Sequence, residues 1–209
     1  MKWMAFLLLA CGSVQIVAAQ NVGIGTSFPS ALLDVNGSFR WRGGSPATGS
    51  VLTSVDGSGN AIWDGTVAFM ARGVNSASVT IPYNSNEDIV FNTEMYDIGG
   101  DYNITTGVFT APVSGIYHFD AGFMWNNPGL NQGYVAITLF AGTSQQATSR
   151  APAVSYSTIS TTVSTTLRLS AGTTIKVAAF HAVASGVNES LLPNSQTAWF
   201  NGHLIRRTL

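Results

Sequence analysis

The chain has 209 residues, of which 45% are hydrophobic and only 9% are charged, and its formal net charge is −1. Charged residues usually make up about 25% of a soluble domain, so this balance offers no basic field for nucleic acid or an anionic membrane surface. The length suffices for one sizeable domain with additional segments.

The N-terminus reads as a targeting segment. Lys2 is followed by the apolar run Trp3–Ala10, and the small residues Val17–Ala19 precede Gln20. This order predicts a secretory signal peptide over residues 1–19 and a mature chain that begins at Gln20. No later apolar run approaches the roughly 18 residues of a membrane-spanning helix, so we expect no membrane span after cleavage.

Cys11 is the only cysteine of the chain. A rival interpretation is a lipoprotein anchored through Cys11, because the preceding residues resemble a lipidation box; the short apolar core before it disfavours this. If the signal peptide is removed at Gln20, the exported protein has no disulfide, and its stability must come from its core or from oligomerisation.

Residues 20–65 form a Gly- and Ser-rich segment with short apolar pairs. Asn36-Gly37 and Asp56-Gly57 are typical hairpin turns. A segment this poor in apolar residues cannot bury a core by itself. We therefore expect a short β or irregular stalk that either packs against other copies of itself or remains partly flexible.

Residues 66–209 carry period-two alternation interrupted by Gly, Asn and Pro, which predicts a single all-β domain. Ten short strands with turns between them are typical of a sandwich or jelly roll. The predicted strands are Val67–Arg72, Ser78–Pro82, Ile89–Tyr96, Val108–Ala111, Gly115–Trp125, Gly133–Ala141, Ala147–Tyr156, Ser160–Leu169, Thr174–His181 and Thr197–Ile205.

The strand at Gly115–Trp125 shows the alternation best. Tyr117, Phe119 and Phe123 point to one side, whereas His118 and Asp120 point to the other. Each buried ring covers roughly 150–250 Å². The aromatic side is therefore predicted to be the core of the domain.

Aromatic, Gly and Asp residues before and within this strand follow a fixed spacing, and two later stretches, Leu167–Val177 and Thr197–Ile205, complete a pattern. The pattern resembles that of the globular head of complement C1q, a relative of the tumour necrosis factor fold. Ala121 stands where that family usually has another aromatic residue. The residues that carry the resemblance are Phe91, Asp97, Tyr102, Phe109, Gly115, Tyr117, Phe119, Phe200 and Gly202.

This resemblance implies a jelly-roll head that assembles as a close homotrimer and binds a ligand, rather than an enzyme. The segment before it is similar to tail-fibre-like stalks of exported bacterial proteins. Together the two resemblances imply a protein that is secreted or displayed at the cell surface of a Gram-negative bacterium.

Three residues are candidates for ligand contact. Trp125 ends the aromatic strand beside a loop, where an exposed ring would stack on a sugar or a partner; a packed core Trp is the favoured alternative. Glu94 and Asp101 belong to an acidic stretch that suits a cation or ligand site, and a solvated strand edge is the favoured alternative.

Calcium is not favoured as a cofactor. Some members of the similar family bind it with acids ahead of the late strands, and the corresponding residues 149–162 contain no Asp or Glu. No nucleophile motif or metal-ligand spacing is present either, so we predict no enzyme and no cofactor. Two functions remain: a trimeric module that binds a protein or glycan, and a structural component of a fibre or surface layer.

Overall fold

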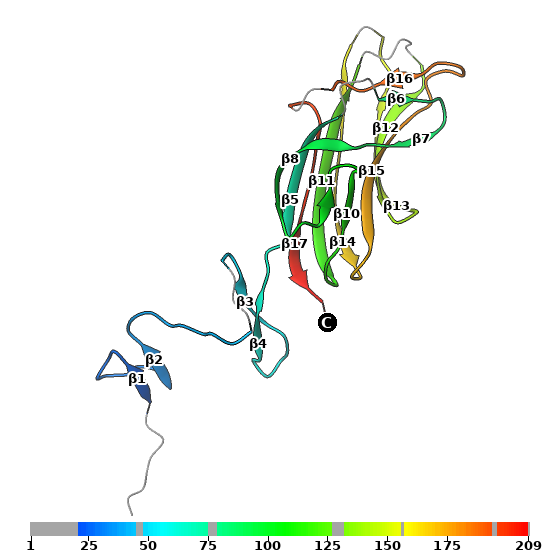
Figure 1. Cartoon of the computed structure of the whole chain (residues 1–209). Helices are drawn as coiled ribbons and strands as arrows, with labels where there is room; N and C mark the ends of the chain where they lie inside the picture. Colours follow the sequence, from blue (N-terminus) through cyan, green and yellow to red (C-terminus); the bar gives the residue numbers. More distant parts are fainter. Residues whose placement is uncertain are drawn as a thin grey trace, which may run out of the picture. The chain divides into compact units, whose positions relative to one another are not determined.

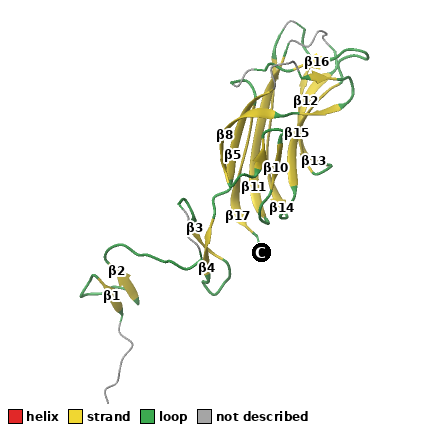
Figure 2. Ribbon diagram, in the orientation of Figure 1, coloured by secondary structure: helices red, strands yellow, loops and turns green. Residues whose placement is uncertain are grey.

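The computed structural model describes residues 21–44, 48–74, 79–126, 132–155, 157–193 and 196–208. These residues form strands, turns and loops and contain no helix, as Figure 2 shows. Within them no helix long and apolar enough to cross a membrane is found. The all-β prediction is confirmed, and the predicted signal peptide with Cys11 lies outside the described residues.

The chain divides into two compact units, Met1–Pro46 and Ala47–Leu209. In the first unit, β1 (Val22–Ile24) and β2 (Leu33–Val35) pair in parallel (Figure 1). The loop between them is held by Asp34, whose Oδ2 accepts hydrogen bonds from the backbone N–H and the hydroxyl of Ser30 at 2.8 and 3.0 Å. A sheet this small has no second layer to cover it.

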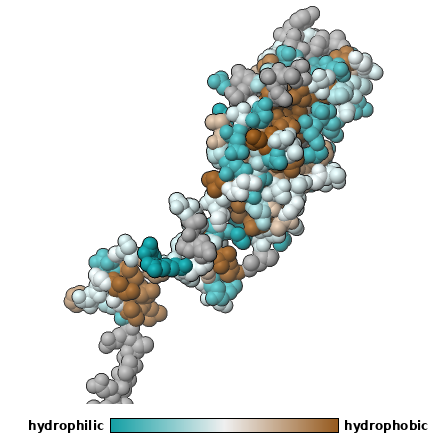
Figure 3. All heavy atoms as spheres, in the orientation of Figure 1, coloured by the Kyte–Doolittle hydropathy of each residue, from teal (hydrophilic) through white to brown (hydrophobic). Residues whose placement is uncertain are grey.

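Apolar side chains of the first unit accordingly remain exposed. Phe28 and Leu32 are 90% and 80% exposed, and apolar residues gather on the surface of this unit in Figure 3. This agrees with the expectation that the segment cannot bury a core by itself.

The second unit begins with a hairpin of β3 (Val51–Ser54) and β4 (Ala61–Asp64). In its turn, Asp56 Oδ1 accepts hydrogen bonds from the backbone N–H groups of Ser58 and Asn60 at 2.9 and 3.0 Å. At its end, Asp64 Oδ1 pairs with Arg207 Nε at 2.6 Å. The hairpin is part of the compact unit Ala47–Leu209, and this ion pair links its end to Arg207.

Five antiparallel strands form one sheet of the head, in the order β14-β11-β17-β5-β8. Gly115–Trp125 pairs with Ile159–Leu169 over its whole length. The strands are β5 (Ala68–Val74), β8 (Phe91–Ile98), β11 (Gly115–Trp125), β14 (Ile159–Leu169) and β17 (Trp199–Arg207).

A second sheet has the order β13-β12-β15-β10-β9, with β7 also pairing with β15. Its strands are β7 (Asn86–Asp88), β9 (Tyr102–Asn103), β10 (Val108–Thr110), β12 (Tyr134–Ala141), β13 (Ser144–Pro152) and β15 (Thr174–His181). A small pair of β6 (Thr80–Ile81) and β16 (Glu189–Ser190) forms a separate two-stranded sheet.

Each of the ten predicted strands overlaps an observed strand. The sequence missed β7, β9 and β16, which have two or three residues each and are too short for alternation to be recognised.

The core lies between the two sheets, and most of its largest fully buried side chains are aromatic. Phe69 of β5 stacks on Tyr102 of β9 and on Phe109 of β10, with ring centroids 4.9 and 5.0 Å apart. Phe109 in turn meets Phe119 of β11 edge-on at 5.4 Å. Rings of one sheet thus pack directly on rings of the other, as the alternation of Gly115–Trp125 predicts.

His181 is a buried polar residue at the end of β15. Its ring is fully buried, Nε2 lies 2.9 Å from the carbonyl oxygen of Ile81, and Tyr83 packs against it edge-on. Burial lowers the pKa of His181 below its ordinary value of 6.5, and the contact with Ile81 only partly opposes this. Burial therefore favours the neutral form of the ring in the folded protein.

We expect the fold to lose stability as the pH falls below about 6.5. At such pH values His181 binds a proton more strongly in the unfolded chain than in the folded one, which favours unfolding. The free energy of unfolding should fall more for the wild type than for His181→Gln between about pH 7.5 and pH 5. Urea unfolding of both proteins at each pH measures this. Equal losses in the two proteins would contradict a buried neutral imidazole.

Candidate binding surfaces of the head

The aromatic residues of the predicted pattern lie in the core. The two tyrosines bond their hydroxyls to backbone carbonyls: Tyr102 Oη donates to the oxygen of Phe91 at 3.0 Å and Tyr117 Oη to that of Val113 at 2.7 Å. Burial raises the pKa of both tyrosines. The buried aromatic members, each at most 5% exposed, are Phe91, Tyr102, Phe109, Tyr117, Phe119 and Phe200.

The non-aromatic members of the pattern shape the backbone. Asp97 accepts hydrogen bonds from the backbone N–H groups of Asp101 and Tyr102 at 3.2 and 2.9 Å, which fixes the turn from β8 to β9. A Cβ at Gly115 would lie 2.8 Å from the carbonyl oxygen of Arg206. These residues are thus explained by folding, with no ligand needed.

Trp125 is not available to a ligand on the single chain. Its side chain is fully buried, its ring meets Phe123 edge-on at 5.7 Å, and its Nε1 donates a hydrogen bond to Thr161 Oγ1 at 3.1 Å. The candidate role in ligand stacking is therefore wrong for this surface, because the residue completes the inward row of β11.

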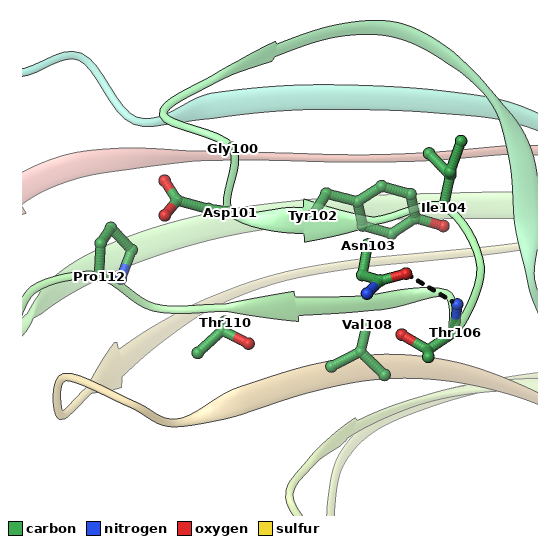
Figure 4. Close-up of a pocket in the computed structure, with 9 residues that line it drawn as sticks. All are labelled: Gly100, Asp101, Tyr102, Asn103, Ile104, Thr106, Val108, Thr110 and Pro112. Atoms are coloured by element: carbon green, nitrogen blue, oxygen red, sulfur yellow. Dashed lines mark hydrogen bonds between the residues drawn. The ribbon is translucent and has the colours of Figure 1, made fainter.

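Glu94 and Asp101 lie in different settings. Glu94 is exposed on β8, whereas Asp101 follows that strand and lines a shallow hollow of about 580 Å³ on the outside of the β9–β10 hairpin. Figure 4 shows Asp101 and Pro112 at one end of this hollow and Thr106 at the other. No group of three or more His, Cys, Asp or Glu among the described residues is arranged to hold a metal ion.

The carboxyl group of Asp101 is partly desolvated. Its Oδ2 is buried and has no hydrogen-bond partner among the described residues. Burial raises the pKa of Asp101, and the neighbouring Asp97 raises it further. The hollow around it combines hydroxyl and amide groups with the exposed apolar side chains of Ile104 and Pro112.

The outer face of the five-stranded sheet is half apolar. The register places Met70 beside Tyr96, and Ala68 beside Ile98, and Tyr96 and Ile98 are 46% and 50% exposed. Trp199 continues this side of the face and lies over Gly122. Exposed apolar side chains that gather on one face of a sheet are typical of an interaction surface.

The other half of this face is polar and centres on His118. His118 and His203 are directly opposite on β11 and β17, with ring centroids 5.6 Å apart. Asp120 Oδ2 lies 3.1 Å from His118 Nε2. The sequence missed this cluster because residues 118 and 203 become neighbours only through strand pairing.

The cluster does not have the geometry of a hydrolase triad. A triad uses one ring nitrogen of His for the serine and the other for the acid. Here Ser164 Oγ and Asp120 Oδ2 both approach Nε2, at 3.4 and 3.1 Å, and Thr166 Oγ1 lies 3.0 Å from Nδ1. The hydroxyl of Ser164 therefore has no oriented base.

The head is similar to known proteins in sequence pattern and in fold. The family model of the C1q domain matches residues 68–205. The globular domain of zebrafish complement 1qA protein superposes with a TM-score of 0.54 at 20% identity, over 68% of this chain and 99% of that domain. Eiger TNF from S. frugiperda gives a TM-score of 0.52 at 12% identity, over 70% of this chain and 96% of that chain. None of the curated protein sequences matches the chain.

The family match spans β5 almost to the end of β17, and therefore both sheets of the head. The solved structures share the same jelly roll. The chain belongs to the C1q domain family.

Proposed function

We propose that this protein is a secreted, non-catalytic module that forms a homotrimer and binds a protein or glycan through the outer surface of its heads. Domains of the C1q and tumour necrosis factor type are typically trimeric, extracellular binding modules without enzymatic activity. In such an assembly three identical sites raise a weak affinity by about 10²–10⁴.

The observation that carries the trimer is the apolar half of the outer face of the five-stranded sheet. Met70, Tyr96, Ile98 and Trp199 belong to three neighbouring strands, and a monomer would leave them in contact with water. Burying them against a second copy removes apolar area at about 25 cal/mol per Å². The exported chain would also have no disulfide to stabilise it, so association supplies what a crosslink would otherwise provide.

The proposed location rests on the N-terminal residues. Their order of Lys2, an apolar run and small residues before Gln20 fits export. The stalk-like segment that follows supports display outside a Gram-negative cell, whether the protein is released or held at the surface.

A structural role in a fibre or surface layer has one specific observation in its favour. The first unit exposes Phe28, Leu32 and Phe39 by 90%, 80% and 66%. Side chains this apolar favour packing against other copies of the same segment. In that role the first unit, rather than the head, would determine the assembly.

Light scattering with chromatography tests the proposal on the chain from Gln20 and on the second unit, residues 47–209. We expect three times the single-chain mass for both, because the apolar face belongs to the head. Met70→Glu should reduce the mass to that of one chain, since a carboxylate would be buried without a partner. Thr110→Glu, which adds the same charge on β10 of the other sheet, should leave the trimer intact.

If the trimer is lost when residues 20–46 are removed, the first unit is responsible for assembly, and the structural role is favoured. A single-chain mass for both forms would contradict the trimeric head.

A further inference from the structure

The outer face of the six-stranded sheet has small side chains at its centre and large ones around them. Ala136 and Thr138 of β12 and Ala178 of β15 point outward, yet they are only 2%, 3% and 0% exposed. Outward residues on a sheet are this well covered only when longer neighbours lean over them. Above Ala136 and Thr138 these longer side chains surround a cavity of about 110 Å³, which we call the groove.

One wall of the groove is aromatic. Tyr134 of β12 and Phe180 of β15 stack with ring centroids 5.8 Å apart and planes inclined by 26°. The guanidinium carbon of Arg150 on β13 lies 4.7 Å from the centroid of the Tyr134 ring. Asn86 of β7 stands opposite Phe180 in the strand register. Rings, a guanidinium and an amide therefore meet at this end.

Hydroxyl and amide groups cover the other side of the cavity. Thr138 Oγ1 lies 3.0 Å from Thr148 Oγ1, and Gln145 donates a hydrogen bond to the same hydroxyl of Thr148. Beyond them, Lys176 Nζ pairs with Asp88 Oδ2 at 2.6 Å and lies 5.9 Å from the Phe140 ring centroid. Asn86 lines both the cavity and the hollow around Lys176.

The charge of the cavity is positive. Arg150 is the one charged residue among those that line it, and no ion pair between described side chains involves Arg150. The nearby Lys176 and Asp88 neutralise each other. The planar guanidinium fork matches a carboxylate with two parallel hydrogen bonds.

The backbone around the floor excludes one class of ligand. β12 and β15 are interior strands, paired on both sides with β13, β10, β7 and each other. An extended peptide that adds to a sheet needs the unpaired backbone of an edge strand. Recognition in this groove must come from side chains alone, and the cavity accommodates a small group rather than a long one.

We propose that this groove binds the terminal residue of an acidic saccharide, a sugar that carries a carboxylate. The C–H face of the sugar ring packs on Phe180, the carboxylate pairs with Arg150, whose guanidinium lies over the Tyr134 ring, and hydroxyls bond to Asn86 and Gln145. This rests on the proposed binding function and names its site and ligand class. The groove lies on the sheet opposite the apolar face, so assembly through that face leaves the groove open.

The test uses the full exported chain and two immobilised probes, D-galacturonic acid and D-galactose, which differ in the carboxylate. We expect the acidic sugar to bind roughly tenfold more tightly than the neutral one. Arg150→Gln should remove this difference, and Arg150→Lys should restore it only in part, because a lysine has no planar fork. Arg42→Gln removes an exposed arginine from the first unit and should leave the binding of both sugars unchanged.

Unchanged binding of galacturonic acid to a folded Arg150→Gln protein would overturn the assigned site and leave the trimeric binding module standing. Equal binding of the two sugars would overturn the acidic ligand class. If an acidic peptide binds in a way that depends on Arg150 and neither sugar binds, the assignment of a saccharide as the ligand would be overturned. Circular dichroism of each variant establishes that the sheet is intact, and the solution mass reports on the trimer independently of either sugar.

Discussion

Replacing Phe69 with alanine is expected to lower the free energy of unfolding of the head by about 3–5 kcal/mol. The ring is only 1% exposed and lies between the two sheets. It stacks on Tyr102 and Phe109 and meets Phe200 edge-on at 4.9 Å. Rings from β9, β10 and β17 all pack against Phe69. Because the two sheets hold these rings in place, they cannot move to fill the cavity that the alanine leaves.

Urea unfolding followed by tryptophan fluorescence measures this loss. Phe69→Leu retains most of the volume and should cost less than half as much, so it gives a result even if the alanine variant fails to fold. Phe28→Ala removes the same ring from a position that is 90% exposed and should change the stability by less than about 0.5 kcal/mol. A Phe69→Ala protein as stable as Phe28→Ala would show that the two sheets do not meet through this ring.

Adding one methyl group at Gly202 is expected to destabilise the head by about 1–3 kcal/mol. A Cβ at this position would overlap the ring of Phe119 and come within 2.9 Å of the ring of Phe69. Both rings are buried by other rings and cannot swing into solvent. Because Gly202 has no side chain, the rings of Phe119 and Phe69 can pack directly on the backbone of β17.

The matched change is Gly57→Ala, because an added Cβ there meets nothing within 4 Å and the residue does not have a positive φ. We expect that protein to unfold at the urea concentration of the wild type. Gly202→Ala should unfold earlier, with an unchanged dependence on urea. Equal midpoints for the two variants would mean that the core has room at Gly202.

Much of the fold followed from local pattern. The strand Gly115–Trp125 has the predicted bounds because its aromatic residues recur only at alternate positions between Pro112 and Asn126. The motif residues, from Phe91 to Gly202, identified the family, since their spacing reflects which rings must meet in the core. Neither Asp97 nor Tyr102 needed a ligand to be explained.

The sequence predicted much less about which residues share a surface. Trp125 was a candidate for stacking at the end of a strand, and the structure buries it, because the inward row of β11 continues to its last residue. His118 and His203 become neighbours through the register of β11 and β17. The same is true of Tyr134, Arg150 and Phe180, which come from three strands and form one wall.

The sequence by itself determined the all-β class, the family, the aromatic core and most strand bounds, because alternation and spacing act along one strand at a time. The tertiary structure alone decided which outward side chains share a face. Pairing β12 with β13 and β15 places a row of small residues between rings and an arginine, and pairing β5 with β8 and β17 gathers the apolar half of the opposite face. Register between strands distant in sequence depends on how whole sheets pack, so no single stretch encodes it.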